Sequence, residues 1–372
     1  MSQTPIVIDL GSSMIKANYS GVEEPMRLLN AIGYPKYDAI LGETNVFMAD
    51  SLDASKGICK IDYPMHRGTL LDDKAEELLF EHLFKSCFSL HSSSVDSPML
   101  LTENAGTPKS TRLALAELLF ETFNVPALSM ALPSVLSLYA SGATTGTVLD
   151  VGDGCSTAIS IFDGYLIPST LQRTDVGGRD VTFSIQRMLR RLGCVMTSSS
   201  ELELIRLMKE SPSTFMFSFS KDSMSSQRVD YTLPDGTVLP LNEERWLAPE
   251  LLFSPDLIGV EGVGVVSLLT NSILSADRDI RSSLYNAIWL SGGSTLFNGF
   301  ASRLSFDLAK STKKTIKMRI SAPPERRYTA FLGGSILASL DSFRSMWLSK
   351  VDYEESGSDS LSRYRSLSSM VC

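Results

Sequence analysis

A short pattern of an apolar run, an aspartate and a glycine turn occurs twice in the chain, and it constrains the fold more than any other feature. Residues 6–13 read IVIDLGSS and residues 148–155 read VLDVGDGC. In each copy a second strand-like run follows the turn, so we expect two β-hairpins that turn at the Asp-x-Gly. Two copies so far apart along the chain favour two lobes of related design that face one another across a cleft.

A third glycine turn comes late in the chain, where residues 287–300 read AIWLSGGSTLFNGF. Here an apolar strand runs into a glycine turn and then into a helical segment, an arrangement that points backbone N–H groups at whatever lies in front of the helix. Further helices are expected over residues 73–90, 111–123, 180–191 and 199–210, the last with Ser199 as its start signal. Strand hairpins that alternate with helices predict an α/β protein.

Composition narrows the class of protein. A chain of 372 residues is too long for one ordinary core, so two or more packed lobes are expected. The net charge of -8 argues against a nucleic-acid binder, and three histidines without Cys/His pairing argue against a zinc site. Five scattered cysteines are typical of reduced thiols. No apolar run approaches the roughly 20 residues that span a bilayer, and the first residues do not resemble a leader. We therefore expect no membrane insertion and a cytoplasmic protein, with the nucleus as an open alternative.

Placed in one cleft, the three turns would form a nucleotide site. Glycine hairpins can surround a polyphosphate with backbone N–H groups, because no side chain intervenes. Asp9 and Asp150 would face each other and hold the water ligands of a Mg²⁺ ion, while Lys16 would place its ammonium on the phosphates. Taken singly, each turn is more often only a turn. The prediction rests on finding all of them in one chain.

Longer motifs make the chain similar to the actin superfamily from end to end. They include VIDLGSSMIKANYSG, VLSLYASGATTGTVLDVGDG, DVGGRDVT, LSGGSTLFNGF and RISAPPERRYTAFLGGSILASLDSF. The resemblance implies an actin-like ATPase fold, with two duplicated lobes and four subdomains around a central nucleotide cleft. The implied subdomain 1 comprises residues 1–30, 64–140 and 329–372, subdomain 2 residues 31–63, subdomain 3 residues 141–176 and 262–328, and subdomain 4 residues 177–261.

The resemblance also implies ATP or ADP with Mg²⁺ in the cleft, with Asp9 and Asp150 serving the metal through water. The implied nucleotide-binding residues are Gly11, Ser12, Ser13, Met14, Lys16, Gly152, Asp153, Gly154, Gly178, Arg206, Lys209, Glu210, Gly292, Gly293, Ser294, Leu296, Phe297 and Arg327. From the residues alone, Arg206, Lys209 and Glu210 also fit a solvated helix face with i,i+3 and i,i+4 pairs.

Two departures from the family bear on hydrolysis. Conventional actin has a Gln that orients the attacking water and a His after the second phosphate loop. The aligned motifs place Pro133 and Thr157 at these positions. Proline has no side-chain amide, and a threonine hydroxyl is a poor general base at neutral pH. We therefore expect an ATP binder with weak or absent hydrolysis and assign no catalytic residue.

Other segments bear on assembly. Arg67 in YPMHRG stands where relatives usually have His. The segment 36–55 is shorter than the actin loop that contacts the next subunit, which leaves polymer contacts on that side open. Residues 253–265, FSPDLIGVEGVGV, match the apolar loop at actin's cross-strand contact, although a buried core loop is the alternative. The match favours head-to-tail assembly into open filaments.

Within the superfamily, YPM, TSSSELEL and SILASLDSF favour the centractin group, whose members build the short filament of dynactin. The resemblance then implies a cytoplasmic, cytoskeletal scaffold. Its implied partners are further copies of the chain, dynactin subunits, dynein and cargo adaptors, and conventional actin. A divergent conventional actin and a nuclear actin-related subunit of a chromatin-remodelling complex are alternatives. Sugar kinases and chaperone-type ATPases, which share the duplicated hairpin plan, are more distant ones.

Overall fold

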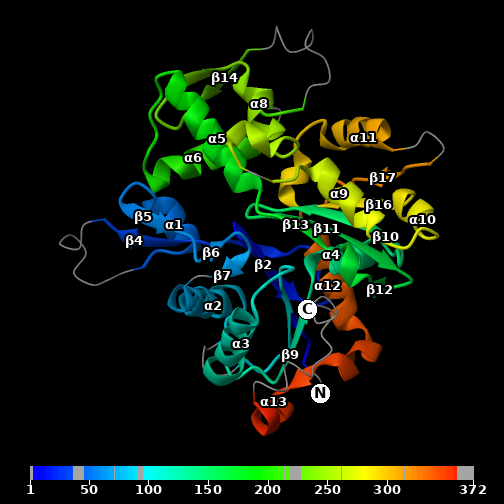
Figure 1. Cartoon of the computed structure of the whole chain (residues 1–372). Coiled ribbons are helices and arrows are strands. Elements are labelled where there is room, and N and C mark those ends of the chain that lie inside the picture. The colour runs from blue at the N-terminus through cyan, green and yellow to red at the C-terminus, as the bar shows by residue number, and fades with distance from the viewer. Residues whose placement is uncertain are drawn as a thin grey trace.

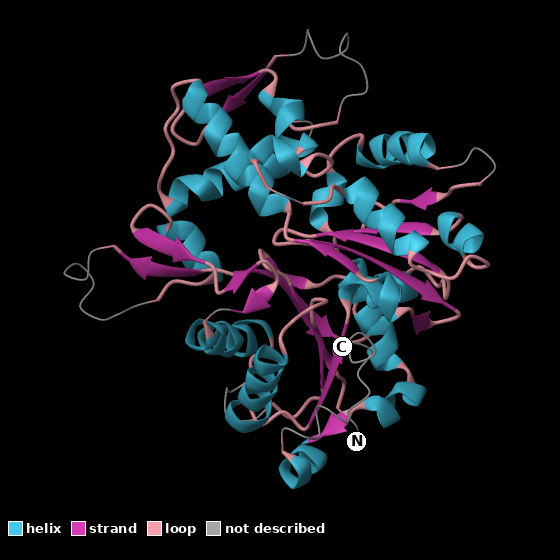
Figure 2. Cartoon of the chain, in the orientation of Figure 1, coloured by secondary structure: helices cyan, strands magenta, loops and turns pink. Residues whose placement is uncertain are grey.

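The computed structural model contains two lobes, each built on its own β-sheet with helices packed around it (Figures 1 and 2). It describes residues 3–36, 46–70, 72–90, 95–212, 214–217, 228–260, 262–312 and 316–357. Residues 37–45, within the segment compared above with actin's subunit-contact loop, lie outside the described residues.

The first lobe is built on a sheet in which the first Asp-x-Gly hairpin supplies two central strands. The strand order is β18-β9-β8-β1-β2-β3, with β1 antiparallel to β2 and parallel to β8. The strands are β1 (Ile6–Leu10), β2 (Met14–Tyr19), β3 (Met26–Leu29), β8 (Met99–Thr102), β9 (Ala127–Ala131) and β18 (Leu348–Ser349).

The second lobe repeats this plan around the second hairpin. Its sheet has the order β12-β11-β10-β16-β17, with β10 antiparallel to β11 and parallel to β16, and β13 paired with β11. The strands are β10 (Gly146–Val151), β11 (Ser156–Phe162), β12 (Tyr165–Leu166), β13 (Gln172–Thr174), β16 (Ile288–Ser291) and β17 (Ile320–Ser321). The predicted duplication of the hairpin is therefore confirmed in the pairing of both sheets.

The predicted helices form with small shifts at their ends. They are α2 (Asp73–Cys87), α3 (Lys109–Glu117) continued by a π-helical turn (Leu118–Thr122), α5 (Gly178–Arg191) and α6 (Ser199–Glu210). The predicted start signal of α6 was one residue off, because the side chain of Ser198 caps the helix by accepting a hydrogen bond from the Glu201 N–H. The predicted strand-to-helix turn contains β16, a 3₁₀ turn (Gly293–Leu296) and α11 (Phe300–Ser311).

Smaller elements complete the two lobes. Among the described residues, three two-stranded sheets pair β4 (Ile32–Pro35) with β5 (Cys59–Asp62), β6 (Met65–His66) with β7 (Thr69–Leu70), and β14 (Val229–Thr232) with β15 (Val238–Leu241). The other helices are α1 (Ala49–Ser55), α4 (Pro133–Ala140), α8 (Glu244–Glu250), α9 (Val265–Leu274), α10 (Arg281–Tyr285), α12 (Thr329–Ser339) and α13 (Lys350–Ser356). The other 3₁₀ turns are Pro168–Thr170, Pro255–Ile258 and Asp341–Met346.

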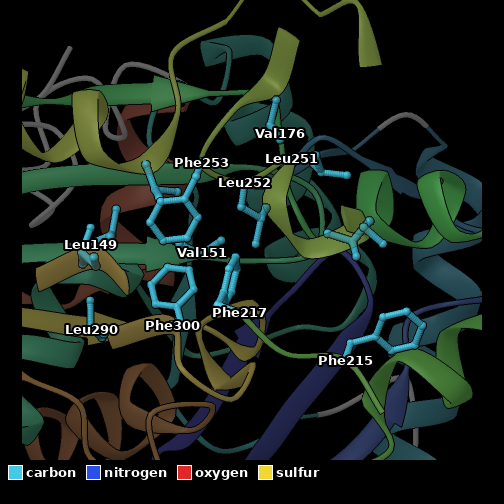
Figure 3. Close-up of a cluster of buried hydrophobic side chains, with 14 of the residues drawn as sticks. Leu149, Val151, Val176, Phe215, Phe217, Leu251, Leu252, Phe253, Leu290 and Phe300 are labelled. Atoms are coloured by element: carbon cyan, nitrogen blue, oxygen red, sulfur yellow. The ribbon is translucent and has the colours of Figure 1, made fainter. Parts of the chain in front are cut away.

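Each lobe has its own aromatic core. In the second lobe the rings of Phe217, Phe253 and Phe300 pack with centroids 4.9–5.6 Å apart, next to Leu149 and Leu290 of the sheet (Figure 3). In the first lobe Phe80, Phe84 and Phe123 form a similar buried group. Because each sheet has a core of its own, each lobe can keep its shape while the contacts between the lobes change.

The lobes are joined where α4 crosses α12. Helix α4 packs on β10, β11 and β16 of the second sheet, whereas α12 packs on β1, β2 and β8 of the first. At the crossing, a Cβ built on Gly333 would lie 1.8 Å from the Leu136 carbonyl oxygen. Below the crossing, the buried hydroxyls of Ser137, Ser291 and Thr329 lie 3.0–3.3 Å from one another. The close crossing and these hydroxyls fix how the two sheets meet.

The division into four subdomains stays a prediction, although the elements can be placed on it. The first sheet falls within residues 1–30, 64–140 and 329–372, and β4 with β5 within residues 31–63. The second sheet falls within residues 141–176 and 262–328, and α5, α6, α8, β14 and β15 within residues 177–261. Among the described residues, no helix is both long enough and apolar enough to cross a membrane.

We predict that Gly333→Ala destabilises the protein, because the added methyl group would collide with backbone at the crossing. The expected loss in the free energy of unfolding is about 2 kcal/mol or more. Gly57→Ala is the matched control, because a Cβ there meets nothing within 4 Å. It should change the free energy by less than about 0.5 kcal/mol. Urea denaturation followed by tryptophan fluorescence tests both variants, and equal effects would contradict the close crossing.

Candidate functional site

A cavity of about 460 Å³ lies where the two glycine hairpins meet the third glycine turn. Its volume is in the range of small-molecule sites. Most of the residues singled out from the sequence line this cavity: Asp9, Gly11, Ser12, Ser13, Met14, Lys16, Asp150, Gly152, Asp153, Gly154, Lys209, Glu210, Gly292, Gly293, Ser294, Leu296, Phe297 and Arg327. Gly178 and Arg206 are not among the lining residues, and both instead contact residues that are.

The first hairpin places a carboxylate and an ammonium group side by side. Asp9 and Lys16 face each other across β1 and β2, with Lys16 Nζ 2.5 Å from Asp9 Oδ2. The Thr102 hydroxyl, on β8, donates to Asp9 Oδ1 at 2.9 Å. A Cβ on Gly11 would lie 2.7 Å from the Met14 carbonyl oxygen, so the turn admits only glycine at this position without a shift. Asp9 is therefore held by neighbours on both sides.

The second hairpin brings a second carboxylate to the same cavity. Asp150 is the last but one residue of β10, and its pKa is raised to about 6, first by burial and then by the charge of Asp9; the Ser291 hydrogen bond and Lys16 oppose the rise. The turn at Gly292 (φ +88°) packs so closely that a Cβ would lie 2.6 Å from Asp150 Oδ1. Two neighbouring carboxylates, one of them paired with an ammonium group, form a donor set that a divalent cation fits, because the cation relieves their repulsion.

A chain of ion pairs lies at one edge of the cavity. Arg327 Nη2 is 2.7 Å from Glu210 Oε2, and Arg206 Nη1 is 2.8 Å from Glu210 Oε1. Arg206 also bonds Glu203 at 2.9 Å and is only 11% exposed at its side chain. Burial alone would raise the pKa of Glu210, but the two arginines outweigh it and the pKa is lowered. Arg206 thus forms the i,i+3 and i,i+4 ion pairs expected of a solvated helix face, but its side chain is mostly buried.

The Asp153 carboxylate ties the second hairpin to two helices. Arg179 Nε lies 3.1 Å from Asp153 Oδ2, and Lys209 Nζ lies 3.6 Å from Oδ1. Lys209 also donates to the Gly178 carbonyl at 2.8 Å. Burial lowers the pKa of Lys209, while the neighbouring Asp153 acts to raise it. Gly178 therefore acts as an anchor for Lys209 at the cavity wall.

The two positions compared above with actin's hydrolysis residues lie in different surroundings. Pro133 lines the cavity at the first turn of α4, where a proline favours helix initiation. Thr157 is opposite Asp150 in the strand ladder, is 7% exposed and is not among the lining residues. In the described part of the chain, the residues lining this cavity include no histidine and no glutamine.

Sequence reasoning missed several lining residues, among them Asn104, Cys155, Phe215 and Asn298. Cys155 and Asn298 lie within segments 148–155 and 287–300, which were singled out, but no role was assigned to either residue. Asn104 and Phe215 lie outside those segments and reach the cavity through tertiary packing. Asn104 Nδ2 donates to the Gly68 carbonyl at 3.1 Å, which links the cavity to the β6–β7 turn.

The fold and the cavity together define a two-lobed protein with a central cleft, and comparison with known proteins identifies the class. The family model described as "Actin" matches residues 1–366, so the chain belongs to the actin family. It is 40% identical over 368 residues to a protein of Neurospora crassa named "Actin-like protein", an alignment that covers 95% of this chain and 96% of that protein. The predicted fold class is thereby confirmed.

We predict that the Cys155 thiol reacts slowly at neutral pH, because burial raises its pKa to about 11. Only the thiolate is alkylated, so the rate at this residue should rise about tenfold per pH unit between pH 7 and 10. Peptide-resolved mass spectrometry after timed iodoacetamide treatment measures the rate. A plateau near pH 8.5, the ordinary thiol value, would contradict the buried setting.

Proposed function

We propose that this chain binds ATP or ADP with Mg²⁺ in the central cavity, hydrolyses ATP weakly or not at all, and assembles into a filament. One observation carries the proposal: Asp9 and Asp150, at equivalent places in two matched hairpins, line one cavity together with Lys16. In this proposal Asp9 and Asp150 hold the water ligands of Mg²⁺, and the metal neutralises charge on the phosphates. The glycine turns and Lys16 donate to the phosphates.

The proposal gives each remaining predicted residue a part in holding the nucleotide. Arg327, Glu210 and Lys209 line the cavity beside Gly292, Gly293, Ser294, Leu296 and Phe297, where the nucleoside would lie. Arg206 keeps Glu210 charged and in place, and Gly178 anchors Lys209. Ser294 fixes the third turn to the second hairpin by donating to the Gly152 carbonyl at 2.8 Å.

Weak hydrolysis is supported by Pro133, which lies at the first turn of α4. In-line attack on a phosphate depends on a positioned water and on charge stabilisation. Pro133 faces the cavity without any side-chain hydrogen-bonding group, and Thr157 lies outside the lining. Among the described lining residues, the position compared with actin's water-orienting Gln therefore carries no side-chain hydrogen-bonding group, which supports weak hydrolysis.

Self-assembly is supported by the loop at residues 253–265. Its base is fixed in the core, since Phe253 is 9% exposed and a Cβ on Gly264 would lie 1.9 Å from the Phe253 carbonyl oxygen. Its tip exposes Leu257, Val260 and Val263 at 58%, 37% and 40%. The buried-loop alternative thus applies to the base only. An apolar tip on a fixed base suits contact with another copy of the chain.

The finer proposal is a cytoplasmic filament of the centractin type, which would bind dynactin subunits, dynein, cargo adaptors and conventional actin. It is supported by the motifs that favour this group. A divergent conventional actin and a nuclear chromatin-remodelling subunit remain alternatives within the family. Affinity purification from the source cells tests it: recovery of dynactin subunits is expected, and recovery of chromatin-remodelling subunits instead would contradict it.

We predict that the double variant Pro133→Gln, Thr157→His gains ATP hydrolysis while its nucleotide affinity stays near that of the native protein. Restoring water orientation should raise phosphate release by about tenfold to a thousandfold. Because Thr157 lies outside the cavity lining, Pro133→Gln alone should give most of the gain. Phosphate release under excess Mg-ATP measures it. Equal release from the native protein and both variants would refute this explanation.

We predict that Leu257→Asp prevents assembly, because it buries a charge in the proposed contact. Sedimentation with Mg-ATP and negative-stain microscopy should show short filaments for the native protein and none for the variant. Val238→Asp is the control: Val238 is 51% exposed on β15, away from the loop, so this variant should pellet like the native protein. Normal pelleting of Leu257→Asp would exclude the loop as the contact.

A further inference from the structure

Arg67 connects the two lobes beside the cavity. It lies in the β6–β7 turn of the first lobe, whose flanking residues Met65 and Leu70 pack on that lobe's core. Its guanidinium reaches α5 of the second lobe, where Nη2 donates to Asp180 Oδ1 at 2.7 Å and Nη1 donates to Oδ2. A bidentate pair of this kind fixes the orientation of both partners, not only their distance.

The partner of Arg67 is firmly held. Asp180 is 6% exposed, and its Oδ2 accepts the Gly177 N–H at 2.8 Å at the start of α5. The next residue, Val181, belongs to the core of the second lobe. The ion pair therefore joins two rigid cores, and the lobes cannot separate here without breaking it.

The β6–β7 turn also lies directly on the second glycine hairpin. A Cβ on Gly154 would be 2.9 Å from the Gly68 nitrogen, and Arg67 Nη1 lies 3.5 Å from the Gly154 carbonyl oxygen. Two arginines of the second lobe also donate hydrogen bonds to the first lobe at this contact between the lobes, which we call the seam. Arg173 donates to the Arg67 carbonyl at 2.6 Å, and Arg179 donates to the Ser12 carbonyl at 3.0 Å.

The backbone of Arg67 shows that the side chain does more than complete a turn. Its φ of +53° is in the left-handed region, which costs energy for any residue except glycine. The cost is offset by the bonds that the guanidinium makes to the second lobe. A glycine would suit the backbone better and would lose all of these bonds.

We propose that Arg67 is a latch that holds the lobes closed over the bound nucleotide and sets the rate at which it leaves. This rests on the proposed function, because the latch controls the same cavity. A ligand held between the hairpins leaves when the seam opens, and the Arg67–Asp180 pair must break for the seam to open. Loss of the pair should therefore raise the dissociation rate constant.

The experiment uses the full chain loaded with the fluorescent analogue etheno-ATP and chased with excess ATP. Arg67→Met and Arg67→Gly should each raise the dissociation rate by about tenfold or more. Arg67→Gly removes the backbone strain at the positive φ. Its thermal unfolding midpoint should therefore stay close to that of the native protein, which shows that the variant is folded. Arg190→Met is the control, because Arg190 is an exposed arginine on the same helix, and it should stay within a factor of about two.

Asp180→Asn tests the partner, since the amide oxygen can still accept the Gly177 N–H. It should raise the dissociation rate, and the double variant Arg67→Met, Asp180→Asn should show no further rise. Rates within twofold of native in both Arg67 variants, or fully additive effects in the double variant, would overturn the latch while leaving nucleotide binding in place. Failure of the native protein to bind etheno-ATP would overturn both the proposed function and the latch.

Discussion

The crossing of α4 and α12 is the constraint on which the rest of the structure depends. Helix α4 packs on the second sheet and α12 on the first, and they meet at Gly333 with no space for a side chain. Because the contact is this close, the two sheets meet near their central strands. Asp9 and Asp150, each the last but one residue of β1 and β10, are thereby brought to one cavity. A looser crossing would separate the two carboxylates.

Because the crossing brings Asp9 and Asp150 to one cavity, two carboxylates lie close together there. Burial and the neighbouring Asp9 raise the pKa of Asp150, so in the absence of added positive charge the pair of carboxylates is unfavourable. Lys16 supplies part of that charge, and a divalent cation would supply the rest. The arginines of the seam keep the lobes together, and the ion pairs around Glu210 join α6 to Arg327 within the second lobe. These charges suit the charged ligand that we propose, and Pro133 adds no side-chain group that would orient a water.

The sequence was enough to predict features that depend on neighbours along the chain. The hairpins and most helix ends follow from local turn chemistry and strand alternation. The repeat of the hairpin was enough to predict two similar lobes, and the long motifs predicted the family. These inferences succeed because glycine turns and apolar runs constrain the backbone locally.

Features set by tertiary packing were not predictable in the same way. Arg206 and Gly178 were expected among the nucleotide-binding residues, yet they contact lining residues instead, because the packing of α5 and α6 decides which of their residues face the cavity. The pairing of Arg67 with Asp180 joins residues 113 apart in the chain, and nothing local indicates it.

The most direct test of the proposed nucleotide binding is the identity of the nucleotide kept by the protein after loading with Mg-ATP and removal of free ligand. The account predicts about one nucleotide per chain, still a triphosphate after hours. Retention of ADP with released phosphate, or no retained nucleotide, would contradict it.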